Sequence, residues 1–130
     1  MKNCMIIFLV FILGFIFGRL PISNLKDKIF LTKLKSIEVI DGDTIYVTNK
    51  DKIEKIRLLD IDCHETSYNS RAEFQSKLCN MYMEEIYQKG EEEKLYLKNL
   101  ISDNSNNIYL QRHKTDKYGR TLGYIYIGKK

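Results

Sequence analysis

Three carboxylates and one arginine stand at positions where a plain fold needs none. Asp43 lies in an Asp-Gly-Asp turn between two apolar runs, while Asp62 and Glu65 follow a third run that contains Arg57. Turns and strand ends are where binding sites are built. Carboxylate oxygens suit Ca²⁺ or Mg²⁺, and a guanidinium suits a phosphate or a carboxylate. The competing interpretation is an ordinary turn followed by a solvated glutamate.

A second polar turn, residues 115–120, ends in another arginine, Arg120. Together these residues provide the groups that cleave a phosphodiester. A cation held by carboxylates and two arginines would neutralise the charge that builds on phosphorus. A spare glutamate, Glu65, would accept a proton from the attacking water.

The elements that must position these residues form a single domain. The chain has 130 residues, of which 44% are apolar and 29% charged, so it can bury a core and is not a disordered tail. Its net charge of +4 says little about partners, but residues 111–130 are rich in Lys and Arg, which would suit a phosphate-bearing ligand. Alternating apolar residues predict five strands, at residues 37–39, 44–47, 53–61, 108–111 and 122–127.

A helical segment is expected between the third and fourth strands. The capping box Ser70-x-x-Glu73 predicts its start. Its expected contact face consists of four apolar residues at helical spacing, Phe74, Leu78, Met81 and Ile86. Gly90 is expected to interrupt it, and Glu91 to open a second helical stretch. Three strands, a helix and two strands predict a mainly β (α+β) fold, a five-stranded OB-fold barrel.

An apolar helix is expected before this domain, because residues 4–17 contain no charged side chain. This run is shorter than the roughly 20 residues of a spanning helix and fits the apolar part of a signal peptide. The small residues of a cleavage site are poorly placed, however, which favours an uncleaved anchor. We therefore expect residues 1–20 to be a signal peptide or membrane anchor and 21–32 a linker. The domain, residues 33–130, would then lie outside the cytoplasm, either membrane-anchored or secreted.

Two stretches resemble the motifs of staphylococcal nuclease-like (thermonuclease) domains. The first reads DGDTIYV from Asp41 and RLLDIDCHE from Arg57, and the second reads DKYGRTLGYIY from Asp116. The resemblance spans residues 33–128 and implies an OB barrel that cleaves DNA or RNA, as an endonuclease that uses Ca²⁺. It also implies a nucleic acid substrate, and we expect the chain to act as a monomer.

The resemblance implies a role for each matching residue. Asp43 and Asp62 would be calcium ligands, together with the backbone carbonyl of Cys63. Glu65 would be the general base or the carboxylate that orients the water.

The phosphate would be clamped by Arg57 and Arg120, and the nucleotide contacted by Lys117 and Tyr118. These roles compete with two others, a nucleic-acid-binding OB module without catalysis and a truncated, inactive remnant. The carboxylates favour the enzyme, since near phosphates they would repel the ligand unless a cation lay between.

Three departures from the family pattern stand out. His64 replaces the proline that usually precedes the glutamate. An insertion, residues 68–89, carries Cys79, which could form a disulfide with Cys63 in an exported protein. The C-terminal helices of the family are expected to be absent, so we expect the insertion to cover the surface they would leave exposed.

Overall fold

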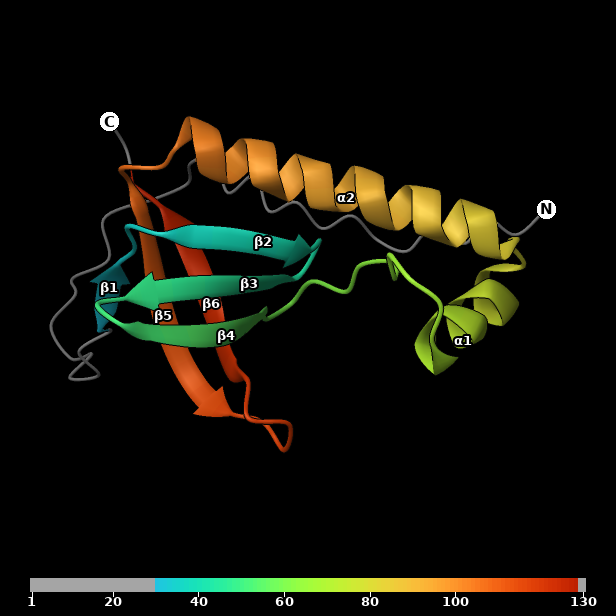
Figure 1. Cartoon of the computed structure of the whole chain (residues 1–130), viewed down its shortest axis with the longest axis horizontal. Coiled ribbons are helices and arrows are strands. Elements are labelled where there is room, and N and C mark those ends of the chain that lie inside the picture. The colour runs from blue at the N-terminus through green and yellow to red at the C-terminus, as the bar shows by residue number, and fades with distance from the viewer. Residues whose placement is uncertain (1–29, 129–130) are drawn as a thin grey trace, which may run out of the picture.

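The computed structural model describes residues 30–128, which form a six-stranded sheet and two helices (Figure 1). The strands are β1 (Leu31–Lys33), β2 (Ile37–Asp41), β3 (Thr44–Asn49), β4 (Lys52–Leu58), β5 (Ile108–Thr115) and β6 (Thr121–Ile127). The helices, α1 (Ser70–Cys79) and α2 (Met83–Asp103), both lie between β4 and β5. The strand order is β1-β5-β6-β4-β3-β2, antiparallel except for the β4–β6 pair.

The expected five-stranded closed barrel is corrected in two respects. β1 adds a sixth strand by pairing with β5, with Leu31 opposite Gln111, although residues up to 32 were expected to be linker. In the described part of the chain, β1 and β2 are the two edges of the sheet and do not pair with each other. The sheet bends instead of closing, since β5 and β6 run steeply across β2, β3 and β4 (Figure 1).

The core lies inside this bend. Alternate residues of β3 and β5 point inward, as period-two patterning requires. The buried apolar cluster comprises Leu34, Ile45, Val47, Ile56, Leu58, Leu97, Ile101, Ile108 and Leu110. Two of these, Leu97 and Ile101, come from the second half of α2, so this helix is anchored to the sheet by burial of apolar area.

Helix α2 runs without a break through Gly90, where an interruption was expected. Gly90 is buried, and a Cβ built on it would lie 2.6 Å from the backbone oxygen of Glu65. The glycine therefore allows close contact between the helix and this loop. Helix propensity alone marks Gly90 as a helix breaker, but its contact with the Glu65 backbone explains why a glycine stands there.

Helix α1 begins one residue earlier than the expected capping box implied. Its N-cap is Asn69, whose Oδ1 accepts from the backbone N–H of Ala72 at 2.8 Å. Asn80 ends the helix in the left-handed conformation, with φ 53°. The expected contact face is only partly correct, because Ile86 is buried whereas Phe74 and Leu78 are 62% and 63% exposed. The buried side of α1 is formed by Ala72 and Gln75.

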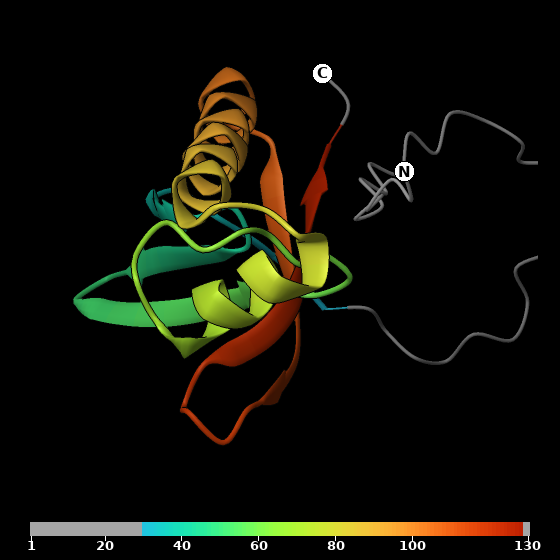
Figure 2. The same cartoon turned by 90° about the vertical axis from the view of Figure 1, so that its right-hand side faces the viewer.

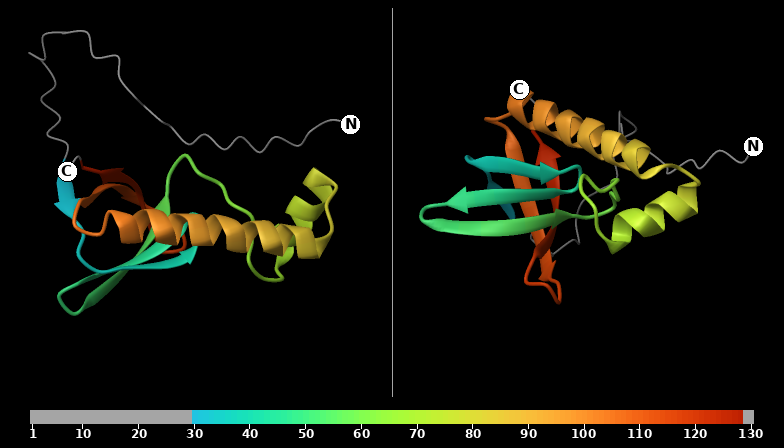
Figure 3. Two further views of the ribbon diagram at one scale, coloured as in Figure 1. Left: turned by 90° about the horizontal axis from the view of Figure 1, so that it is seen from above. Right: turned by 45° about the vertical axis from the view of Figure 1, so that its right-hand side comes forward.

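The two helices extend the molecule at one end of the sheet. Figures 1 and 3 show α2 running past the ends of the strands to α1, which lies beyond them. Figure 2 views this end directly, with α2 above the strands and α1 in front of them. The insertion thus flanks the end of β4 rather than covering the core.

The expected signal peptide or anchor, residues 1–20, lies outside the described residues. Among helices within residues 30–128, none is both long and apolar enough to cross a membrane.

Candidate functional site

The turn between β2 and β3 packs against the chain that follows β4. A Cβ on Gly42 would lie 2.6 Å from Sγ of Cys63, so only glycine permits this contact. The backbone N–H of Cys63 donates to Oδ2 of Asp43 at 3.0 Å. The Asp43 carboxylate is thereby brought against the loop after β4, which carries Asp62 and Glu65.

Arg57 joins the two predicted aspartates. Its Nη1 lies 2.9 Å from Oδ2 of Asp43, and its Nη2 lies 3.0 Å from Oδ1 of Asp62. Nη1 also donates to the backbone oxygens of Leu58 and Ile61, at 3.0 and 2.9 Å. These bonds fix the guanidinium in one orientation, with its planar fork between two carboxylates.

Burial dominates the electrostatics of Asp43, which is 8% exposed. It raises the pKa of this carboxyl to about 6, although the N–H of Cys63 and the charge of Arg57 lower it. The nearby Asp41 raises the pKa further. A cation placed beside Asp43 would favour its ionised form, since opposite charge stabilises a carboxylate.

Glu65 is held by the first turn of α1. Nε of Arg71 lies 3.0 Å from one carboxylate oxygen, and Nδ2 of Asn69 donates to the other at 2.8 Å. Nη2 of Arg71 also contacts Oδ1 of Asp62. Arg71 therefore links Glu65, the expected base, to Asp62, an expected metal ligand. The sequence did not suggest this contact.

Gln75 of α1 binds the backbone on both sides of His64. Its Oε1 accepts from the N–H of Glu65 at 2.9 Å, and its Nε2 donates to the oxygen of Cys63 at 2.9 Å. The side chain is buried, at 6% exposed. The Cys63 carbonyl, the expected third metal ligand, keeps a second lone pair, so this hydrogen bond does not preclude ligation.

Helix α2 holds the same loop from the other side. The backbone N–H of His64 donates to Oε2 of Glu93 at 2.7 Å, and Nδ1 of its ring lies 2.8 Å from Oε1. His64 is 7% exposed and faces α2. These contacts restrain the loop at the position where the family usually has a proline.

Cys63 contributes its backbone here and not a reactive sulfur. Burial, followed by the negative charges of Glu93 and Asp43, raises the pKa of its thiol well above the usual range. Cys63 holds a free thiol in the described structure, so the disulfide with Cys79 considered above is not formed.

The second predicted group of residues lies in the turn between β5 and β6. Oδ1 of Asp116 accepts from the backbone N–H groups of Tyr118 and Arg120, each at 2.9 Å, and Oδ2 accepts from Nε of Arg120 at 2.8 Å. Burial opposes ionisation of Asp116, but these donors lower its pKa overall. The Tyr118 ring is 71% exposed, with the Lys117 ammonium 5.0 Å and the Arg120 guanidinium 5.5 Å from its centre.

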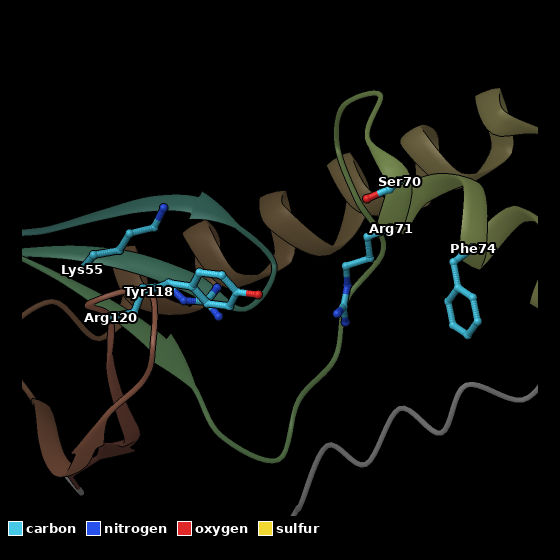
Figure 4. A pocket seen from close by; sticks show the side chains of 6 residues that line it. All are labelled: Lys55, Ser70, Arg71, Phe74, Tyr118 and Arg120. Atoms are coloured by element: carbon cyan, nitrogen blue, oxygen red, sulfur yellow. The ribbon is translucent and has the colours of Figure 1, made fainter.

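A cavity of about 590 Å³ lies between this turn and α1. Its lining residues are Lys55, Ser70, Arg71, Phe74, Tyr118 and Arg120 (Figure 4). Three of these side chains are cationic, two are aromatic and none is acidic. Such a lining suits an anionic ligand with aromatic rings.

The predicted residues thus fall into two groups. Asp43, Arg57, Asp62 and Cys63 are in contact, and Glu65 joins them through Arg71. Lys117, Tyr118 and Arg120 form a separate turn across the cavity. Sequence reasoning missed three residues that hold the first group together, Arg71, Gln75 and Glu93. The one sequence signal that pointed to this contact was Gly90, a glycine within a helical run, which lies one turn before Glu93 and packs closely against the loop.

The residues fit a hard divalent cation by the chemistry of their donors. Within residues 30–128, no three His, Cys, Asp or Glu side chains gather as a metal-binding cluster. Asp43 and Asp62 nevertheless converge on a single positive charge, that of Arg57. Carboxylate and backbone oxygens are the donors that Ca²⁺ takes.

Comparisons with known proteins agree with the motifs. Residues 55–130 match the family described as staphylococcal nuclease homologue. The chain is 27% identical to a thermonuclease of Staphylococcus hyicus over 113 residues, covering 87% of this chain and 57% of that protein. A thermonuclease of Staphylococcus intermedius is 26% identical over 106 residues, covering 82% and 53%. An uncharacterized protein of Methanocaldococcus jannaschii is 34% identical over 103 residues, covering 72% and 47%. The chain therefore spans about half the length of the curated relatives it matches.

Proposed function

This chain belongs to the staphylococcal nuclease homologue family, and on that premise we propose that it is a nuclease that hydrolyses phosphodiester bonds of DNA, RNA or both. The observation that carries the proposal is the convergence of Asp43 and Asp62 on Arg57, beside a cationic cavity. The relatives named thermonuclease support the same activity.

The chain's own residues would divide the work of binding and proton transfer. Arg57 and Arg120 would contact the phosphate, where guanidinium forks match its oxygens. Glu65 would accept a proton from the attacking water. A carboxylate has about four acceptor positions, and Arg71 and Asn69 occupy two of those on Glu65. The same two contacts would keep the carboxylate in one orientation during the reaction.

We propose Ca²⁺ as the cofactor, held by Asp43, Asp62 and the backbone oxygen of Cys63. When bound, it would supply positive charge that neutralises the charge developing on the phosphate oxygens. Gln75 and Glu93 would keep the loop of these ligands in place through the contacts described above.

A nucleic-acid-binding module without catalysis is the alternative, and the carboxylates argue against it. Asp62 and Glu65 contact Arg71, which lines the cavity that would receive the phosphates, and so close to a phosphate these carboxylates would repel the ligand. A cation between them and the phosphate removes that repulsion and also serves hydrolysis.

The test is cleavage by the full chain of single-stranded DNA, double-stranded DNA and RNA, with Ca²⁺ and with a chelator. We expect cleavage only with the cation, and expect closed circular strands to be cut if the enzyme is an endonuclease. Glu65→Gln should lower the rate by about a hundredfold or more. Glu91→Gln, at an exposed position on α2, is the matched control and should cleave normally.

Cation binding has a readout of its own. A ligand that binds the folded state raises the melting temperature, so Ca²⁺ should stabilise the wild type and not Asp43→Ala. Undiminished cleavage in the chelator, or in Glu65→Gln, would refute the mechanism. Binding of all three nucleic acids without cleavage under any condition would favour the alternative.

We also propose that the protein is membrane-anchored or secreted. The support is the uncharged run of residues 4–17 in the sequence. Fractionation of cells that produce the full chain would test this, and recovery of the whole chain in the cytosolic fraction would contradict it.

A further inference from the structure

Helix α1 gives the cavity a wall that the predicted site residues do not include. Ser70, Arg71 and Phe74 line it from α1, opposite Lys55, Tyr118 and Arg120 from the strands and the β5–β6 turn (Figure 4). We propose that this wall is a second nucleotide subsite, in which Phe74 stacks on an unpaired base and Arg71 and Ser70 bind the adjoining phosphate. The proposal rests on the proposed nuclease function and names where a longer substrate would be held.

The chemistry of the α1 wall matches that of the turn across the cavity. Each wall presents one exposed ring and one arginine, Phe74 with Arg71 and Tyr118 with Arg120. Bases of any sequence stack on aromatic rings, and a cationic groove follows the backbone. The pattern therefore suits consecutive nucleotides of one strand better than a small organic anion, which would need only one ring.

Arg71 connects this wall with the proposed reaction centre. Two of its groups, Nε and Nη2, contact Glu65 and Asp62, while the side chain is 49% exposed at the cavity. A guanidinium carries five N–H donors, so it can hold these acids and also contact a phosphate. The bond to be cleaved would lie near Glu65, with the flanking nucleotides on the two rings.

The volume is consistent with this occupant. Pockets for small ligands range over about 300–1,000 Å³, and this open cavity of about 590 Å³ lies within that range. A strand that enters beside Tyr118 and leaves past Phe74 would extend beyond the cavity at both ends. The subsite would therefore matter for oligonucleotides and not for the shortest substrates.

A neighbouring residue supplies the control. Leu78 lies one helical turn after Phe74 and is equally exposed, 63% against 62%, but is not among the cavity's lining residues. If exposed apolar groups on α1 merely affect solubility or folding, Phe74→Ala and Leu78→Ala should behave alike. If the cavity is a subsite, only Phe74→Ala should weaken substrate binding.

The first measurement is the KM of the full chain for single-stranded oligonucleotides of increasing length. Loss of a stacked base costs about 1–3 kcal/mol, so Phe74→Ala should raise KM about tenfold for oligonucleotides of roughly six nucleotides. The effect should disappear for a mononucleotide diester, which has one base and is too short to reach both walls, and Leu78→Ala should match the wild type throughout. Thermal melts of both variants verify that each is folded.

The second measurement reads the contact directly. The chain contains no tryptophan, so Phe74→Trp introduces a single fluorescent reporter at the subsite. In a chain that also carries Glu65→Gln to prevent cleavage, a single-stranded oligonucleotide should quench this emission, whereas Leu78→Trp should stay unquenched.

The possible results distinguish failure of the subsite proposal from failure of the proposed nuclease function. Cleavage by the wild type with equal KM values for Phe74→Ala and Leu78→Ala at every length would overturn the subsite and leave the nuclease function standing. Equal quenching of both reporters would likewise overturn it. A wild type that neither binds nor cleaves any oligonucleotide would overturn both proposals.

Discussion

Gln75 is the residue on which the geometry of the site loop should depend most. Its amide bonds two backbone groups of the loop, the oxygen of Cys63 and the N–H of Glu65, from a position on α1. Gln75→Met removes both hydrogen bonds and keeps a side chain of similar length. The substitution therefore tests the hydrogen bonds without opening a large cavity.

The expected magnitude follows from the two groups left without a partner. A buried polar group that loses its hydrogen bond costs about 1–3 kcal/mol. Cys63 and Glu65 are only partly buried, so water would satisfy part of the loss, and we expect about 2 kcal/mol in all. For a domain of this size, the melting temperature should then fall by roughly 8–16 °C.

Activity should fall further than stability alone would require. A displacement of about 1 Å in a catalytic group can lower the rate about a hundredfold, and Gln75 restrains both the proposed ligand at Cys63 and the proposed base at Glu65. We therefore expect kcat to fall by about that factor at temperatures where the variant is still folded. Thermal melts and cleavage rates, measured on the same preparations, provide the comparison.

The matched control is Gln88→Met on α2. Gln88 is exposed and donates to Glu92 at 3.1 Å, so loss of this surface hydrogen bond should change stability by no more than about 0.5 kcal/mol. Equal stability and equal kcat in the two variants would refute the reasoning. A less stable Gln75→Met with normal kcat would show that the glutamine supports the fold and does not position the site.

Three further predictions concern Asp43, Gly90 and the two arginines. Because burial raises the pKa of Asp43 from 3.8 to about 6, its contribution to stability is present below about pH 4 and is lost as the pH rises through 6. Asp43→Asn should thus be more stable than the wild type at pH 7 without Ca²⁺, by up to roughly 3 kcal/mol, yet inactive. Urea unfolding of both proteins at about pH 4 and pH 7 measures this, and the same difference in unfolding free energy at the two pH values would contradict it. Gly90→Ala should destabilise the protein by about 1–3 kcal/mol and lower cleavage, since its Cβ would lie 2.6 Å from the Glu65 oxygen; a melting temperature above that of the wild type would show that helix propensity prevails. Arg57→Lys and Arg120→Lys should each lower kcat about a hundredfold or more, and rates near wild type in both would exclude the two-arginine clamp.

The strands were predictable because their residues alternate, whereas the departures arose from tertiary contact. Each strand from β2 to β6 overlaps one of the predicted apolar runs, although none has the same bounds, since a half-buried strand imposes a period of two. β1 escaped prediction because its three residues show no periodicity and are ordered by pairing with β5. Gly90 was wrongly predicted to interrupt the helix for a related reason. Its helix propensity is poor, but in the fold it lets α2 approach the Glu65 backbone closely.

In the site, too, the motif residues could be predicted from the sequence, whereas the residues that hold them in place could not. The motifs identify Asp43, Arg57 and Asp62, and the comparisons confirm the family to which they point. The catalytic, metal-binding and nucleotide-binding roles remain predictions. Arg71, Gln75 and Glu93 could not be found, because ordinary helix-surface residue types acquire their partners only when α1 and α2 fold against the loop.

The loop that carries the proposed base is held by two helices of unequal anchorage. The N–H of His64 is bonded to Glu93 on α2, the helix that contributes Leu97 and Ile101 to the core. The N–H of its neighbour Glu65 is bonded to Gln75 on α1, which lies beyond the ends of the strands. Local opening takes place most readily where few apolar contacts must be broken. The two adjacent amides should therefore exchange hydrogen at different rates, Glu65 with each transient release of α1 and His64 only when the core itself opens.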